Sequence, residues 1–177
     1  SRRDDLDQLI QWQIKKSLPF GVEEASITHS PGARAGSGGD FVVVAARRDV
    51  VAEYEGVCDE VGIHAGLVDL ATLSVANLYL AGGAPVGDWL IVHIRPEYTS
   101  IAIMRGSDLI FFRTRAEGDP EPLADVVHQT AMYYQDRLSG RGLSRVFAGG
   151  RSRLAGGVEA ASREIEARLS TRVEPLD

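Results

Sequence analysis

Cysteine, basic charge and long apolar runs are all scarce in this sequence, and each scarcity excludes a class of protein. The single cysteine, Cys58, allows no internal disulfide and no thiolate cluster for a metal, which suits a reducing compartment. Lysine and arginine number 19 against 25 aspartate and glutamate residues, so the net charge is -6. Because affinity for phosphate backbones needs a basic face, this balance argues against a nucleic-acid partner. No apolar run reaches the roughly 18 residues that a membrane-spanning helix needs.

The motifs of several enzyme classes are also missing. The histidines at positions 29, 64, 93 and 128 lack a metal-ligand spacing such as His-x-x-x-His, so we expect no metal site. No Gly-x-Ser-x-Gly elbow marks a hydrolase nucleophile. The glycine-rich segment 31–40 lacks the Gly-Lys-Ser/Thr ending of a phosphate-binding loop and is expected to be a strand connection. From the residues alone we therefore predict no catalytic side chain.

The sequence does contain the composition and periodicity of a folded protein with helices and strands. Apolar residues make up 44% and charged residues 25% of the 177 residues, enough for one domain or two small lobes. In the first part, the pattern predicts helices up to Pro19, at 49–61 and at 71–80, and strands at 24–30, 41–46 and 63–70. This order describes a small split α/β sandwich. The helix at 49–61 is expected to point these residues inward: Val50, Val51, Tyr54, Val57 and Val61.

A second lobe is predicted after the glycine-rich linker "AGGAPVG" at 81–87. Its expected elements are strands at 90–94, 101–104 and 109–112, a helix at 121–138, a strand at 145–150, a helix at 154–169 and a strand at 172–175. Three antiparallel strands, helix, strand, helix and strand is the element order of a ribonuclease-H-like half. We therefore predict an α/β (α+β) fold with an accessory lobe at 1–80 and a ribonuclease-H-like lobe at 88–177.

Two short turns separate the strands of "LIVHIRPEYTSIAIMRGSDLIFFRT", and they differ in kind. Gly106 suits the first central position of a type II′ hairpin turn. The other turn contains Arg95 and Pro96, where a tight connection normally uses Gly, Asn or Asp. This unusual turn raises the question whether the loop was shaped to hold a ligand.

Four segments of the chain carry a resemblance to one known family, and they occur in the same order there: "LDQLIQWQIKKSLPFGVEEASITHS", "FVVVAARRDVVAEYEGVCDEVGIHAGLVDL", "MYYQDRL" and "RVFAGGRSRLAGGVEAASREI". They resemble the PilM family, the actin-like cytoplasmic proteins of type IV pilus assembly. The first two are similar to the family's accessory subdomain, and the last two to its later helix and adenosine-side Gly-Gly turn. The resemblance implies an actin-like fold, of which this chain holds the accessory subdomain and one reduced lobe. It also implies a fragment, since the family's first phosphate hairpin would lie before Ser1.

The resemblance assigns the Arg95 turn to the family's second phosphate-binding hairpin, where an Asp-x-Gly motif handles the metal and the phosphates. His93 and Arg95 stand at the acid and glycine positions. The expected vestigial nucleotide site consists of these two residues with Thr99, Ser100, Gly149 and Gly150. An imidazole is a poor ligand for Mg²⁺, and a Cβ followed by proline hinders the close backbone approach that a phosphate cradle needs. We therefore expect no cofactor here, with ATP and Mg²⁺ bound only by an intact family member, and an enzymatic role is left open.

By the same resemblance, the chain is expected to be a scaffold that docks the N-terminal tail of a PilN-like inner-membrane protein. The candidate partner-binding residues are Trp12, Pro19 and Phe20. Trp12 lies off the apolar stripe of its helix, so we expect it to be partly exposed. The protein would be cytoplasmic and peripheral to the inner membrane, reaching the membrane only through its partner. Homo-oligomer formation is left open.

Two alternative functions share this architecture. One is an actin-like ATPase whose first phosphate motif lies upstream of Ser1. The other is the L-type cytoplasmic component of type II secretion. An Asp-x-Gly hairpin in the upstream sequence would favour the ATPase, and its absence would favour a scaffold.

Overall fold

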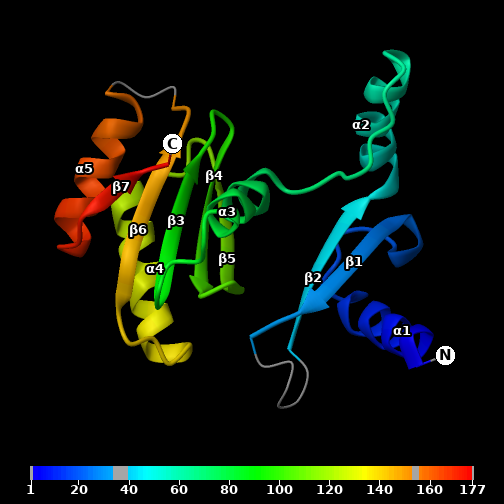
Figure 1. Cartoon of the computed structure of the whole chain (residues 1–177), viewed down its shortest axis with the longest axis horizontal. Helices are drawn as coiled ribbons and strands as arrows, with labels where there is room; N and C mark the ends of the chain where they lie inside the picture. Colours follow the sequence, from blue (N-terminus) through cyan, green and yellow to red (C-terminus); the bar gives the residue numbers. More distant parts are fainter. Residues whose placement is uncertain (1, 34–39, 153–155, 177) are drawn as a thin grey trace. The chain divides into compact units, whose positions relative to one another are not determined.

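The computed structural model describes residues 2–33, 40–152 and 156–176, and the chain divides into two compact units. Unit 1 comprises residues 1–69 and unit 2 comprises residues 70–177 (Figure 1). Each unit has its own β-sheet, with two strands in unit 1 and five in unit 2.

Unit 1 is built on a two-stranded antiparallel sheet. Its elements are α1 (Arg2–Ile14), η1 (Val22–Glu24), β1 (Ala25–Pro31), β2 (Phe41–Arg47) and α2 (Arg48–Glu60). α1 lies on the sheet face that carries Ala25 and His29, where Ile10 is buried and Asp7 contacts His29. The predicted strands at 24–30 and 41–46 are confirmed, as expected for a valine-rich run such as that of β2.

Two predictions for unit 1 are wrong. α2 forms, but none of its residues is buried. Instead of packing inward, its predicted core positions Val50, Tyr54, Val57 and Val61 are between 42% and 70% exposed. The segment 63–70 forms no strand. An amphipathic period shows that a segment has an apolar side, but it does not show whether another element of the chain covers that side.

Unit 2 contains one mixed five-stranded sheet. Its elements are α3 (Ala71–Ala81), β3 (Asp88–Ile94), β4 (Tyr98–Arg105), β5 (Asp108–Ala116), α4 (Leu123–Arg137), β6 (Leu143–Gly150), α5 (Gly157–Leu169) and β7 (Val173–Pro175). The strand order is β5-β4-β3-β6-β7, with β3, β4 and β5 antiparallel and with β6 and β7 parallel to β3. The predicted ribonuclease-H-like half is confirmed.

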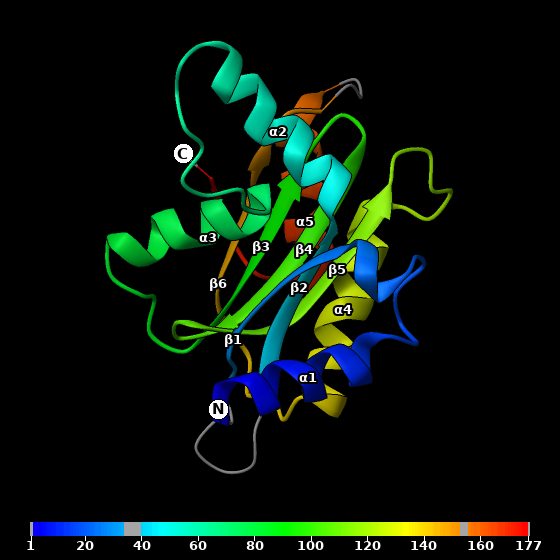
Figure 2. The same ribbon diagram turned by 90° about the vertical axis from the view of Figure 1, so that its right-hand side faces the viewer.

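Helices cover both faces of this sheet, as Figure 2 shows with α3 crossing in front of the strands and α4 and α5 behind them. Leu90 and Val92 of β3 face α4 and α5, whereas Trp89 and Ile91 face α3. Nearly every residue of β3 and β4 is buried. A strand that is covered on both sides has a continuous apolar run in its sequence, as the predicted strands at 90–94 and 101–104 do.

The boundary between the units differs from the predicted linker at 81–87. It falls between Asp69 and Leu70, so α3 belongs to unit 2. The ring centroid of Tyr79 on α3 lies 4.6 Å from that of Phe147 on β6. The hydroxyl of Tyr79 donates a hydrogen bond of 3.2 Å to the carbonyl of Pro175. The glycines of 81–87 therefore belong to a connection inside one unit, between α3 and β3.

Candidate functional site

The six residues of the predicted nucleotide site lie together where β3 ends. His93 pairs across the sheet with Ser100 of β4 and with Gly149 of β6. The next residue, Ile94, pairs with Thr99 and Gly150, and Arg95 follows it in the turn. The sheet register thus brings together residues that are up to 57 positions apart in the sequence, as His93 and Gly150 are.

His93 is only 5% exposed and lies on the sheet face that α3 covers. Its Nδ1 is 3.0 Å from the hydroxyl of Thr72 in the first turn of α3, and Thr72 is itself buried. Burial, with a smaller effect from the positive charge of Arg95, lowers the pKa of His93. The side chain is therefore a neutral imidazole near pH 7, and its visible role is to hold α3 to β3.

Two backbone N–H groups at this turn are already bonded within the protein. The N–H of Arg95 donates to the carbonyl of Tyr98 at 2.8 Å, and the N–H of Arg151 donates to the carbonyl of Ile94 at 2.8 Å. Pro96 has no N–H to offer. The Nε of Arg95 is buried and has no hydrogen-bond partner among the described residues.

Both glycines at the end of β6 are needed for the protein's own packing. Gly150 has a φ of +120°, and a Cβ built there would lie 2.0 Å from the carbonyl oxygen of Ile94. A Cβ on Gly149 would lie 2.3 Å from the Cβ of Leu176. The close approaches that these glycines permit are therefore approaches of the chain to itself.

Unit 1 has a groove of about 440 Å³ between α1 and β1. It is lined by Asp7, Ile10, Gln11, Ile27, Thr28 and His29. The side chains of Asp7 and His29 are joined by a 2.7 Å contact between Oδ1 and Nε2. β1 pairs only with β2 among the described strands, so no described strand pairs with its other edge, where the carbonyl of Ala25 accepts a hydrogen bond from Nε of Arg48.

Trp12 on α1 is 72% exposed, and Leu9, one turn before it, is 51% exposed. The exposure of Trp12 is as predicted. Pro19 is exposed and Phe20 is half-buried after the end of the helix. Among the described aromatic pairs, none includes Trp12 or Phe20. No described ring contact therefore joins Trp12 to Phe20, and the assignment of Trp12, Pro19 and Phe20 to partner binding stays a prediction.

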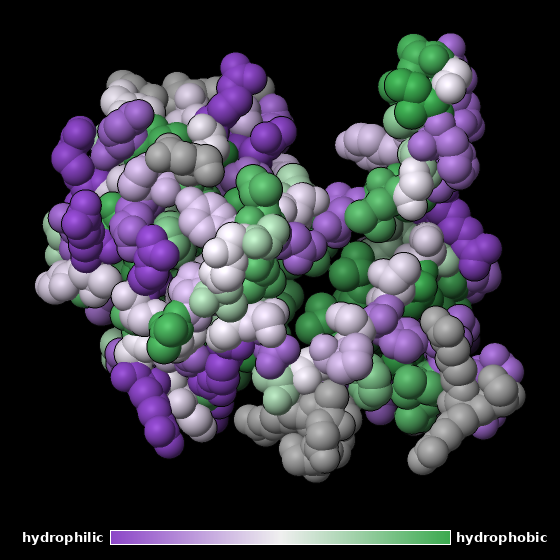
Figure 3. Space-filling view, in the orientation of Figure 1, coloured by the Kyte–Doolittle hydropathy of each residue, from purple (hydrophilic) through white to green (hydrophobic). Residues whose placement is uncertain are grey.

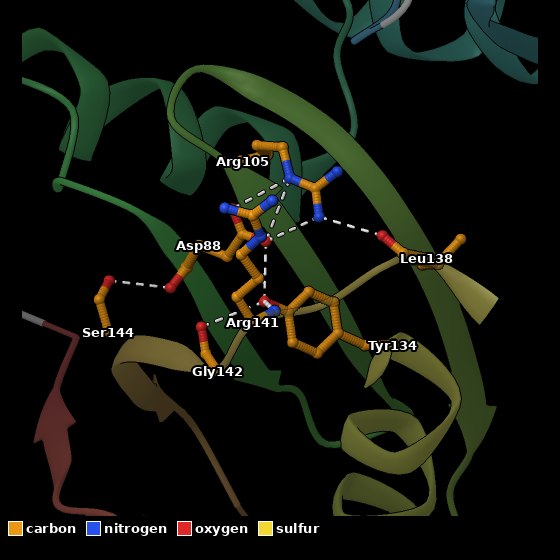
Figure 4. A network of polar contacts seen from close by, with 7 residues as sticks. All are labelled: Asp88, Arg105, Tyr134, Leu138, Arg141, Gly142 and Ser144. Atoms are coloured by element: carbon orange, nitrogen blue, oxygen red, sulfur yellow. Dashed lines mark hydrogen bonds and ion pairs between the residues drawn. The ribbon is translucent and has the colours of Figure 1, made fainter. Parts of the chain in front are cut away.

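A polar network at the opposite end of β3 was not predicted (Figure 4). Arg105 donates three hydrogen bonds of 2.8–3.1 Å to the carboxylate of Asp88, and it also donates to the carbonyl of Leu138. The hydroxyl of Tyr134 donates to Asp88 Oδ2 at 2.8 Å. No local pattern reveals this network, because Tyr134 lies 46 residues from Asp88.

Within the ranges that the structure describes, no three His, Cys, Asp or Glu side chains lie close enough together to hold a metal ion. No helix in those ranges is long and apolar enough to cross a bilayer.

Two solved structures share this architecture. A chain of a PilM–PilN type IV pilus biogenesis complex superposes with a TM-score of 0.73 at 15% sequence identity, over 99% of this chain and 62% of that one. A Bacteroides thetaiotaomicron protein with an actin-like ATPase fold and unknown function gives a TM-score of 0.53 at 7% identity, over 92% and 58%. At these identities the likeness shows the fold, which is actin-like. The chain spans about three fifths of the length of these relatives.

No curated protein matches the sequence. A family model does match it, however, and that model describes the type IV pilus assembly protein PilM. The match covers residues 2–136, which includes all of unit 1 except residue 1, and unit 2 through most of α4. Because this match extends over well more than half of the 177 residues, the chain belongs to the PilM family of type IV pilus assembly proteins.

Proposed function

We propose that this chain is a cytoplasmic docking component of a type IV pilus assembly platform, and that it binds the N-terminal tail of a PilN-like inner-membrane protein. The observation that carries the proposal is the groove between α1 and β1, with Trp12 exposed on the same helix. Membership of the PilM family supplies the pilus context. A solved relative is a complex of PilM with PilN, which supports this choice of partner.

The groove has the parts that capture of an extended peptide requires. A peptide strand can pair with the free edge of β1, so that its backbone hydrogen bonds supply affinity for any sequence. Alternate side chains would then enter the groove towards Ile10 and Ile27, and polar groups would meet Asp7 and His29. Trp12 offers the large, rigid anchor that dominates the binding energy of many interfaces.

Trp12→Ala should weaken binding of a synthetic N-terminal peptide of the neighbouring PilN-like protein by more than about tenfold, because a tryptophan anchor contributes about 2 kcal/mol or more. The free energy of unfolding of the chain should change by less than about 0.5 kcal/mol, since the Trp12 side chain is 72% exposed. Isothermal titration of the full chain with the peptide measures the first quantity, and urea unfolding measures the second.

The matched control for this variant is Leu78→Ala on α3, which truncates another large apolar side chain with 67% exposure. Leu78→Ala should leave peptide affinity unchanged. If Trp12→Ala binds the peptide as well as the parent chain does, Trp12 is not the anchor and the docking proposal loses the residue that best supports it.

We also propose that the turn after β3 binds no magnesium nucleotide. Arg95 and Arg151 use their backbone N–H groups inside the protein, and Pro96 has none. Buried neutral His93 offers a nitrogen where Mg²⁺ prefers a hard oxygen ligand. The residues at this site therefore do not fit the group that the fold family binds, and no reaction step is assigned to it.

Titration of the chain with Mg-ATP should accordingly give no saturable heat up to millimolar nucleotide. Removing a phosphate from water is costly, and only donors that are already in place can offset that cost. The Nε of Arg95 is a buried side-chain donor without a hydrogen-bond partner among the described residues, so Arg95→Ala is the control. A low-micromolar dissociation constant that Arg95→Ala abolishes would show that the nucleotide site is functional.

A further inference from the structure

One surface of unit 1 takes no part in the proposed peptide groove. α2 has no buried residue, and four of its apolar positions are exposed: Val50 by 42%, Tyr54 by 65%, Val57 by 65% and Val61, at its C-cap, by 70%. In Figure 3, green side chains with paler ones between them lie along one side of α2, and purple side chains gather on the other. Scattered exposed apolar residues are ordinary, but a contiguous stripe of this kind marks an interaction site.

The spacing of these residues makes the stripe narrow and continuous. At about 100° per residue, the four positions fall within one arc of about 60° on the helix surface. We call these four residues the α2 stripe. The exposed apolar residues Ile63 and Leu67, at 61% and 81%, continue the same stretch of chain beyond the helix.

The α2 stripe has a carboxylate border on one side. On the same helical projection, Glu53 and Glu60 lie about 40–60° from its outer positions, whereas Glu55 lies on the far side of the helix. All three glutamates are exposed. Among the described residues, no basic side chain forms an ion pair with any of them.

We propose that the α2 stripe and its glutamate border dock a basic amphipathic segment of a protein partner. The stripe would bury the apolar side of that segment, and Glu53 and Glu60 would face its lysine or arginine side chains. A second copy of the same stripe would bring glutamate borders together, and an anionic lipid surface would be repelled. Cytoplasmic segments next to membrane spans are rich in lysine and arginine and have the required charge. The proposal holds whether or not the groove beside α1 binds a tail.

The test uses the full chain and a fluorescent amphipathic model peptide of leucine and lysine, followed by fluorescence anisotropy. Tyr54→Ala should weaken binding by about tenfold, because it removes the largest apolar contact of the stripe. Alanine favours a helix, so α2 is retained. Glu53→Lys should weaken binding by roughly fivefold, since it replaces an attraction by a repulsion.

The matched control is Glu55→Lys, which makes the same charge change on the far side of the same helix and should leave the affinity within twofold of the parent chain. Equal losses of affinity from Glu53→Lys and Glu55→Lys would show that net charge alone explains the binding, and they would overturn the proposal. So would the absence of saturable binding, or equal binding of a leucine and glutamate peptide. A dimer in sedimentation equilibrium that Tyr54→Ala dissociates would identify a second copy as the occupant and overturn it as well.

Failure of this proposal is distinguishable from failure of the proposed function. Trp12→Ala should leave binding of the leucine and lysine peptide unchanged, and Tyr54→Ala should leave binding of the PilN-like tail unchanged. Loss of both ligands with either single variant would show that one surface serves both, contrary to the proposal of a separate site on α2.

Discussion

Gly150→Ala should destabilise unit 2 by about 3 kcal/mol or more. The φ of +120° at this position costs an alanine at least the roughly 1–2 kcal/mol of an unfavourable backbone region. The added Cβ would also stand 2.0 Å from the carbonyl oxygen of Ile94, so that β3 and β6 must move apart. Overpacking of this kind costs a further 1–3 kcal/mol or so. Urea unfolding followed by circular dichroism measures the loss.

The control for this variant is Gly106→Ala, in the turn between β4 and β5. Gly106 has a φ of +58° but no atom within 4 Å of an added Cβ, so its substitution should cost only about 1 kcal/mol. The difference between the losses of stability in the two variants measures the cost of the contact with Ile94. Equal losses would mean that β6 adjusts without strain and that Gly150 is not required by packing.

The second large effect is expected at Asp88. Asp88→Asn should cost about 2–3 kcal/mol, because it leaves the Arg105 guanidinium beside a neutral amide and disturbs the hydrogen bond from Tyr134. The side chain of Asp88 is only 12% exposed, so water cannot replace these partners fully.

Asp125→Asn is the matched control, since Asp125 pairs with Arg168 at 2.8 Å but both side chains are exposed. That change should cost less than about 1 kcal/mol. Similar losses from the two variants would contradict a special role of the Asp88 network.

The pH dependence of stability gives a second measurement on the same network. Burial by itself would raise the pKa of Asp88, but the hydrogen bonds from Arg105 and Tyr134 outweigh it and hold the pKa below its ordinary value. The stabilisation is therefore complete above about pH 4, where the carboxyl group is ionised even in the unfolded chain, and it is lost as the pH falls through the lower folded-state pKa. The cost of Asp88→Asn should shrink over that acid range.

The contribution of Tyr134 to stability should change with pH in the opposite direction, and in the alkaline range. Burial and the negative charge of Asp88 raise the pKa of its hydroxyl. Its contribution is complete below about pH 10, where the unfolded tyrosine is still protonated, and it is lost as the pH rises through the folded-state pKa. Tyr134→Phe should flatten this alkaline loss, since it removes the titrating group.

The sheet of unit 2 could be predicted from the sequence because its signals are local. The apolar runs of β3 and β4, the turn at Gly106 and the 3.6-residue period of α4 each indicate one element, and the order of elements then restricts the topology. The boundary of the units could not be read in the same way. Gly82, Gly83 and Pro85 indicate a break in secondary structure, but only the packing of Tyr79 on Phe147 shows on which side of the division α3 belongs.

The candidate sites show the same difference between local and distant information. The resemblance to a known family placed His93 and Gly150 at one site, and the sheet register does bring them together. It could not show that Gly150 accommodates the carbonyl of Ile94, because that contact joins residues 56 positions apart. The helical period of α2 predicts an apolar side, and the prediction that this side packs in the core is wrong. Periodicity identifies an apolar side, and a partner outside the chain leaves no signal in it.

The uneven distribution of burial has a consequence for the local stability of the two units. Among the described residues of unit 1, only Ile10 and Ala25 are buried, whereas β3 and β4 of unit 2 are covered almost throughout. Amide hydrogens of β3 and β4 should therefore exchange with solvent only when unit 2 unfolds as a whole, and those of β1 and β2 through smaller openings of unit 1. A ligand that binds the folded form of unit 1 then binds only while these openings are closed. The ligand's apparent affinity depends on how often the free unit occupies that state, as well as on the contacts made in it.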